Sequence, residues 1–172
     1  MAMAQLFSKP VLAGAIALAT LAGCAMDEES QVRAQVDEWV DIGKTLYFDS
    51  QMTCTAGVFA LVSDQVKSAA PHAVTIREGL TLIRQRGVAK FQDPGLSPSD
   101  ISAQINSQDI AIGNGVLSSG LDARECLTEA WRADFVAALQ ARGAVLIYRR
   151  AGNALAIIDQ TNRQVFFARG DV

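Results

Sequence analysis

Apolar residues recur at helical spacing through the N-terminal half of the chain, beginning near residue 28. The first such pattern covers about residues 28–48 and has acidic residues at its start, where they suit the helix dipole. A second pattern covers residues 53–69 and is ended by Pro71. The apolar positions are Val32, Val36, Trp39, Val40 and Leu46 in the first pattern, and Cys54, Val58, Leu61, Val62 and Val66 in the second. We therefore expect two helices in this half of the chain.

Capping residues mark two further helices in the middle of the chain. Residues 75–78 match a capping box, in which each end of the motif satisfies a free backbone donor of the other. The helix that they open should end at Gly87. Ser97 followed by Pro98 predicts another helix start, and that helix should last to about Gln108.

The segments around these helices give less uniform patterns. Residues 91–95 contain Pro and Gly and predict a loop. Residues 110–120 are ambiguous between a short strand and a turn. Residues 122–125 resemble a capped helix start, and we expect a strong helix from there to about Arg142, closed by Gly143.

The last thirty residues change to a pattern of short, β-rich runs separated by turn residues. These runs are Ala144–Tyr148, Leu155–Ile158 and Val165–Phe167. They predict a three-stranded antiparallel β-meander at the C-terminus. Because the helices come first and the strands last, the expected fold class is α+β.

The predicted meander is apolar on both faces, since its runs do not alternate with polar residues. One interpretation is that helices of the same chain cover both faces. The other is that one face or edge contacts a partner protein, because large apolar patches are rarely left open.

The first 24 residues have the character of an export signal. An apolar core, Val11–Thr20, is too short to span a bilayer as a permanent helix and fits a cleavable secretory segment. The sequence Leu21-Ala22-Gly23-Cys24 that follows resembles the lipobox of bacterial lipoproteins. This resemblance implies cleavage after Gly23, attachment of diacylglycerol to the Cys24 thiol and acylation of the new amino group. Alanine rather than aspartate follows Cys24, which by the same resemblance favours the outer membrane.

Composition refines this division of the chain. Of 172 residues, 50% are hydrophobic and 19% charged, with a formal net charge of −3. Without residues 1–23, which carry only one charge, 149 residues remain with a net charge of −4. That balance argues against a general nucleic-acid binder. We expect a cleaved signal peptide at 1–23, a short lipid-anchored linker at 24–29 and a single periplasmic α+β domain at 30–172.

Two cysteines remain after Cys24 is assigned to lipid. An even pair in an exported protein predicts a disulfide, here between Cys54 and Cys126. The alternative makes Cys54 a nucleophile with His72, the only histidine, as its base. Residues 53–58 resemble the segment that opens the catalytic helix of a family of cysteine peptidases of the bacterial cell wall, but they lack its aspartate and carry one extra residue before the glycine.

Other candidate chemistry is sparse. Arg84, Arg86 and Lys90 lie close together in the sequence, and arginines 149–150 occupy an expected hairpin turn. Such side chains can contact anionic lipid or glycan, or they can be solvated surface charges. One histidine and no Cys-x-x-Cys spacing predict no metal site, and residues 113–115 lack the rest of a phosphate loop, so we expect no cofactor.

These observations predict a lipoprotein of the outer membrane that faces the periplasm and has an accessory or scaffold role, without catalysis, in an envelope assembly or in envelope maintenance. Its expected partners are membrane lipid, through acylated Cys24, and an envelope protein, through the apolar meander. One alternative is a binding module that holds an apolar or amphipathic ligand between the meander and the helices. A second alternative is a cell-wall hydrolase that uses Cys54.

Overall fold

The computed structural model describes residues 26–170. The predicted signal peptide and the predicted lipidation site, Cys24, lie outside the described residues. Five helices are present in this part of the chain: α1 (Glu29–Asp37), α2 (Ile76–Arg86), α3 (Pro98–Gln108), α4 (Ile110–Asp122) and α5 (Glu129–Gln140). Its strands are β1 (Val40–Ser50), β2 (Cys54–Val66), β3 (His72–Ala73), β4 (Val88–Phe91), β5 (Val145–Arg149), β6 (Ala154–Asp159) and β7 (Gln164–Gly170).

All of these strands join one seven-stranded sheet in the order β1-β2-β7-β6-β5-β4-β3. Neighbouring strands are antiparallel except for β3 and β4, which are parallel. The mixed α and β class is as predicted, but the predicted three-stranded sheet is wrong. Strands β5, β6 and β7 do pair in succession, yet β4 and β2 bond to their outer edges and extend the sheet on both sides. Their continuous apolar runs reflect this central position, because both of their faces are covered.

The two helices expected in the N-terminal half are also corrected. The pattern at 28–48 is helical only to Asp37, and its second part is strand β1. The pattern at 53–69 is strand β2, which lies between β1 and β7 and is buried along its first half. A strand that is apolar on both faces contains apolar residues at helical spacing as readily as a helix does. Only pairing with neighbouring strands then distinguishes a strand from a helix.

The capping predictions hold for both helix starts except for one partner: the Glu78 carboxylate accepts from the Val74 backbone N–H over 2.9 Å, not from Thr75 as predicted. The Thr75 hydroxyl accepts a hydrogen bond from the Glu78 backbone N–H, and α2 ends at Gly87, whose φ is 79°. Ser97 and Asp100 form a capping box at α3, which ends at Gln108 as expected. Residues 110–120, whose sequence is ambiguous between a strand and a turn, are part of helix α4. The helix expected from residue 122 begins only at Glu129, after a segment of turns. The predicted loop at 91–95 begins one residue late, because Phe91 ends strand β4.

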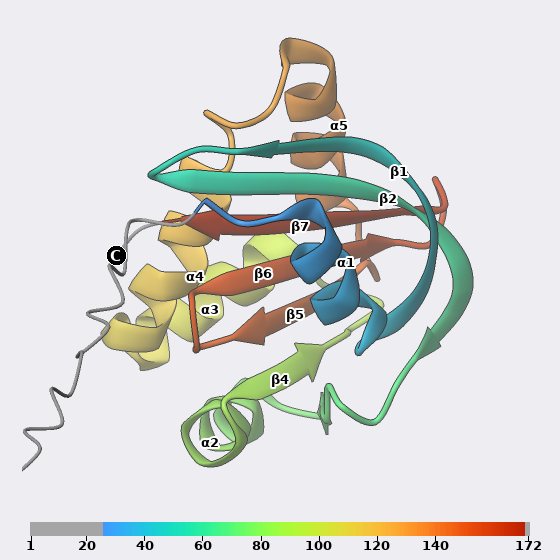
Figure 1. The fold of residues 1–172 in the computed structure, drawn as a ribbon. Coiled ribbons are helices and arrows are strands. Elements are labelled where there is room, and N and C mark those ends of the chain that lie inside the picture. Colours follow the sequence, from blue (N-terminus) through green and yellow to red (C-terminus); the bar gives the residue numbers. More distant parts are fainter. Residues whose placement is uncertain (1–25, 171–172) are drawn as a thin grey trace, which may run out of the picture.

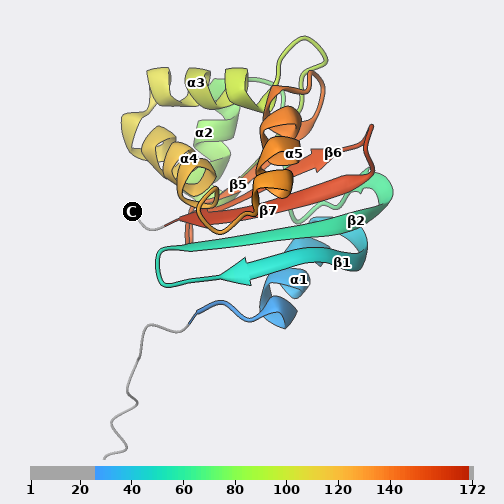
Figure 2. The same ribbon diagram turned by 90° about the horizontal axis from the view of Figure 1, so that it is seen from above.

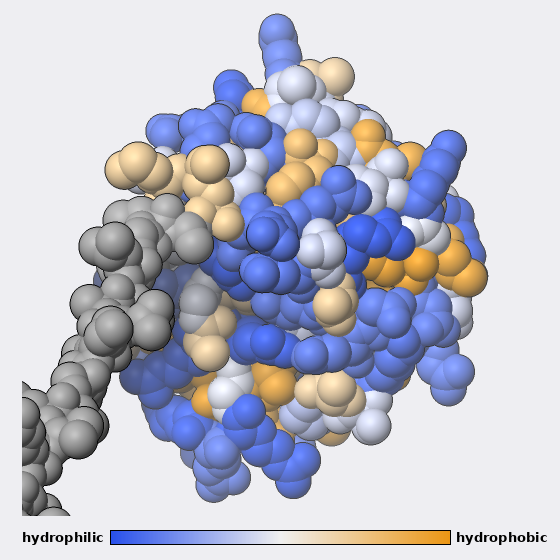
Figure 3. All heavy atoms as spheres, in the orientation of Figure 1, coloured by the Kyte–Doolittle hydropathy of each residue, from blue (hydrophilic) through white to orange (hydrophobic). Residues whose placement is uncertain are grey.

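Helices cover the sheet unequally, as Figures 1 and 2 show. Helices α2 to α5 gather on one face, and α1 crosses the other face in front of β5, β6 and β7. Two apolar cores result, one on each face, and the alternating residues of the central strands contribute to both. Leu146 and Tyr148 of β5, for example, face the first core, and Val145 and Ile147 face the second. The apolar side chains of β5 to β7 are therefore buried by the chain itself. The surface on the α1 side is mostly hydrophilic, with scattered apolar residues (Figure 3).

Candidate functional site

The chain enters the fold at one end of the sheet, where β1 and β7 end and β2 begins. Asp27 is held there by three contacts. Its backbone N–H donates to Ser50 Oγ over 2.9 Å, its Oδ2 accepts from Thr55 Oγ1 over 2.7 Å, and its Oδ1 forms an ion pair with Arg169. We call this the Asp27 end of the sheet. Because Asp27 follows Cys24 by only three residues, a group bound to that cysteine stays close to it.

Arg169 is the centre of this contact network. Its Nη2 donates to the side chain of Gln35 in α1 over 3.0 Å, and its guanidinium lies 5.5 Å from the ring centre of Phe167. The side chains of Arg169 and Asp27 are only 27% and 17% exposed, so their ion pair is partly shielded from water. Sequence reasoning missed this contact. Its partners are 142 residues apart, and no local signal connects them.

The predicted disulfide is present at the same end. Cys54, the first residue of β2, is bonded to Cys126, which follows α4, and the two Cα atoms are 6.0 Å apart. Both cysteines are buried. The bridge attaches the segment that connects α4 to α5 to the sheet.

The alternative pairing of Cys54 with His72 has no geometric support. His72 lies in β3, at the far edge of the sheet, and four strands separate β3 from β2. The Cys54 sulfur is moreover occupied by the disulfide, so it has no thiol to ionise.

The basic residues singled out from the sequence do not form one patch. Arg84 lies in the last turn of α2 and bonds Asp109 over 2.5 Å. Lys90 lies in β4, where Ala89 and Phe91 point into the core under α2 to α5. Because side chains alternate along a strand, Lys90 faces the opposite side of the sheet from α2.

Arg86 lies close to Arg150. It ends α2, and the carbonyl of the next residue, Gly87, accepts a hydrogen bond from the Arg150 backbone N–H over 2.8 Å. Arg150 lies in the turn between β5 and β6, at the Asp27 end of the sheet, and both arginines are exposed. Arg149 points elsewhere: it pairs with Glu38 and lies over the ring of Trp39, 5.2 Å from its centre.

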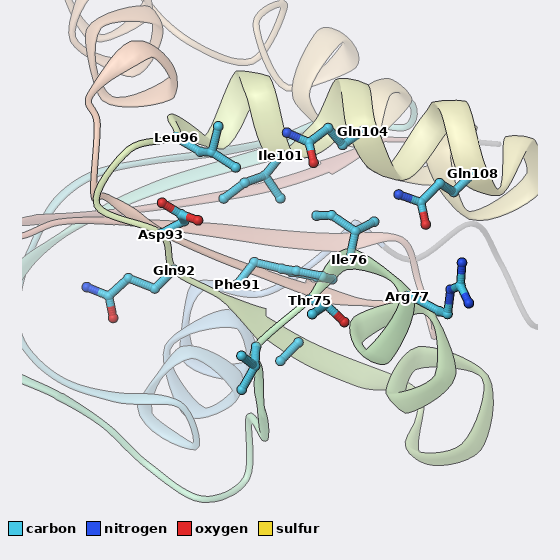
Figure 4. Close-up of a pocket in the computed structure, with 12 residues that line it drawn as sticks. Thr75, Ile76, Arg77, Phe91, Gln92, Asp93, Leu96, Ile101, Gln104 and Gln108 are labelled. Carbon is cyan, nitrogen blue, oxygen red and sulfur yellow. The ribbon is translucent and has the colours of Figure 1, made fainter.

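One cavity lies on the helical side of the molecule, between α2, α3 and the end of β4. It has a volume of about 540 Å³. Apolar side chains from all three elements form its inner wall, and polar side chains from α2 and α3 border it (Figure 4). The apolar residues are Ile76, Phe91, Leu96 and Ile101, and the polar ones include Thr75, Arg77, Gln104 and Gln108.

A smaller groove of about 240 Å³ lies between α3, α4 and α5, above β6. Its lining is mostly apolar, and it leaves two leucines of α4 in contact with water: Leu117 is 37% exposed and Leu121 59%. The other apolar lining residues are Val116, Val136, Leu139 and Leu155. This groove lies between the helices and the central strands.

Among residues 26–170, no cluster of histidine, cysteine and carboxylate side chains could hold a metal ion. The same residues contain no helix with the length and apolarity needed to cross a membrane. No protein-family model, curated protein or solved structure matches the chain.

Proposed function

We propose that this protein is a lipoprotein of the outer membrane, anchored through acylated Cys24 and facing the periplasm, with an accessory or scaffold role in the cell envelope. The observation that carries the proposal is the lipobox at residues 21–24, three residues before the firmly held Asp27. A tether this short favours work at the membrane surface rather than at a distance from it.

Two further observations support the proposal. The Cys54–Cys126 disulfide suits an oxidising compartment such as the periplasm. The same bond leaves Cys54 without the thiolate that a cysteine hydrolase would need, which favours a role without catalysis.

The test of the anchor is to produce the full chain in a Gram-negative host with labelled palmitate. We expect label and membrane association for the native chain, and neither for Cys24→Ser. Mass spectrometry of the native product should give an N-terminus at Cys24 carrying acyl chains. An unlabelled native chain, or a Cys24→Ser chain that remains in the membrane fraction, would contradict the proposal.

The choice of membrane is tested by one residue. We expect Ala25→Asp to shift the protein from the outer to the inner membrane in a density gradient, and Ala25→Ser, the matched control, to leave it in place. Equal distribution of all three chains would argue against sorting by this position.

The groove between α3, α4 and α5 favours a second candidate function, the binding of an apolar or amphipathic ligand. A fluorescent fatty acid is a direct probe, added to the Cys24→Ser chain so that the chain's own lipid does not compete. Gly120→Leu places a side chain in the groove and should reduce binding strongly, whereas Val74→Ser, outside it, should not. Binding that Gly120→Leu does not alter would exclude the groove as the site.

A further inference from the structure

Two of the exposed large apolar side chains lie at the Asp27 end of the sheet. Met26 is 59% exposed and Met52, in the turn between β1 and β2, is 75% exposed. Both line one depression of about 250 Å³, together with Asp27 and Arg169. Apolar surface also gathers at the tip of the β1–β2 hairpin in Figure 3. Methionine is unbranched and flexible, and it adapts to soft or irregular surroundings.

The tether restricts what this end can contact. Asp27 is three positions after Cys24, and an extended chain advances at most about 3.6 Å per residue, so the two Cα atoms are no more than about 11 Å apart. The polar headgroup layer on each side of a bilayer is roughly 5–8 Å thick. Because Asp27 is bonded to the β1, β2 and β7 ends, an acylated Cys24 holds that whole end of the sheet at the headgroups.

Basic side chains lie further along the same end. Arg86 and Arg150 are exposed where α2 ends and β5 turns into β6, and the bond from Arg150 to Gly87 keeps them adjacent. Arginine forms strong, charge-assisted hydrogen bonds with phosphate oxygens. In the sheet order the β5–β6 turn lies about three strand widths, roughly 14 Å, from the β1–β2 turn, and β4 lies beyond it, so the arginines extend the same end of the sheet.

We propose that the Asp27 end of the sheet is a membrane-docking surface, with Met26 and Met52 among the lipid headgroups and Arg86 and Arg150 on anionic lipid phosphates. The inference rests on the proposed acylation of Cys24 and adds an orientation to it. The strands then stand upright on the bilayer. The opposite end, with the turn between β6 and β7, projects into the periplasm.

Fluorescence quenching by brominated lipids tests the orientation. The full-length acylated protein carries Met52→Trp or, as a matched control, Val62→Trp, and is reconstituted in vesicles of brominated phosphatidylcholine with phosphatidylglycerol. Val62 is also 59% exposed but lies towards the other end of β2, and both variants keep Trp39 and Trp131 as background. Thr53→Trp, at the same turn, is a second probe should Met52→Trp fold poorly.

We expect the bromine atoms to quench Met52→Trp several-fold more than Val62→Trp. Equal quenching of two variants that both sediment with the vesicles would overturn the orientation while leaving the anchor intact. A chain that carries no acyl group and does not sediment would instead overturn the anchor, and the orientation with it.

Neutralising the two arginines tests their contribution to lipid preference separately. Arg86→Gln with Arg150→Gln should reduce the gain in Met52→Trp quenching that phosphatidylglycerol gives over phosphatidylcholine alone. Arg142→Gln with Arg163→Gln removes the same charge from exposed positions at the opposite end, beside and within the turn between β6 and β7, and should leave that gain unchanged. Equal losses in both double variants would show that net charge, rather than this surface, attracts anionic lipid.

Discussion

Asp109 connects two helices through one carboxylate. Its Oδ1 accepts the Ile112 backbone N–H over 2.9 Å and so caps α4, while its Oδ2 accepts from Arg84 of α2. The Asp109 side chain is 15% exposed and the Arg84 side chain 52%. The carboxylate that caps α4 is therefore better shielded from water than the guanidinium that pairs with it.

Replacing Asp109 with alanine should lower the free energy of unfolding by about 1 kcal/mol, because α4 loses its cap and Arg84 its partner. Urea denaturation of both proteins measures the change. Asp134→Ala removes an exposed carboxylate from the outside of α5 and is the matched control, expected within about 0.5 kcal/mol of the native chain. A similar loss of unfolding free energy in both variants would show that the effect comes from the change in net charge and not from the contacts of Asp109.

Two carboxylates predict how stability depends on pH. Hydrogen bonds from the Ile112 backbone N–H, and then from Arg84, lower the pKa of Asp109. The backbone N–H and the hydroxyl of Ser97 lower the pKa of Asp100. A carboxyl with a lower pKa in the folded chain stabilises the fold above its unfolded pKa of about 4, and the benefit is lost as the pH falls through the folded pKa.

We therefore expect these two groups to give a constant contribution above about pH 5 and a falling one below about pH 4. Urea midpoints measured from pH 6 to pH 2.5 follow the loss. Asp100→Asn should make the decline shallower. A decline of unchanged steepness in that variant would exclude Asp100 from it.

At the scale of elements, α4 packs closely enough to distinguish two of its own glycines. A Cβ on Gly115 would collide with the Tyr148 hydroxyl and lie 2.9 Å from Asn153 Oδ1. That hydroxyl is buried and donates to the same Asn153 oxygen over 2.8 Å. A Cβ on Gly120 would meet only Leu155, at 3.9 Å.

Gly115→Ala should destabilise the protein by about 1–3 kcal/mol, since Tyr148 must move and its hydrogen bond breaks. Gly120→Ala should stabilise it by about 0.5–1 kcal/mol, because alanine is the better helix former and has room there. Thermal unfolding followed by circular dichroism gives both changes. Equal shifts of the same sign would contradict the packing of α4 on β5.

Sequence alone predicts elements whose boundaries depend on neighbouring residues. The caps at Thr75 and Ser97 and the stop at Gly87 involve atoms within four residues, and all three are where the sequence indicates. The three C-terminal strands were recognisable because turn residues separate them. Cys54 and Cys126 were predictable as a pair because, after Cys24 is set aside, no other cysteine remains.

Strands β1 and β2 were not predictable by the same means. Residues 40–50 and 54–66 contain so many apolar residues that some of them fall at helical spacing. Both segments are nevertheless rich in β-branched and aromatic residues, a signal that favours strands. What fixes β2 as a strand is its pairing with β7, about a hundred residues further along the chain, and β1 in turn pairs with β2. The Asp27–Arg169 contact depends on the same pairing of β2 with β7, so it was equally unpredictable from the sequence.

At the scale of the whole molecule, the disulfide closes a separation of 72 residues between β2 and the end of α4. Replacing both Cys54 and Cys126 with serine should lower the free energy of unfolding by about 4 kcal/mol on the chain-entropy account. Urea denaturation with and without a reductant measures it. The Cys24→Ser chain keeps the bridge and should show the same dependence on reductant as the native chain, whereas the double variant should show none.

The position of β7 has a consequence for the order in which the molecule forms. The last strand of residues 26–170, β7, lies between β2 and β6 and pairs Gly170 with Cys54. Until residues 164–170 arrive, β1 and β2 are an isolated hairpin, which is marginally stable in water. Long-range pairing of this kind is also slow. The sheet therefore closes only after residues 164–170 are available, because the two strands that β7 joins come from opposite parts of the described chain.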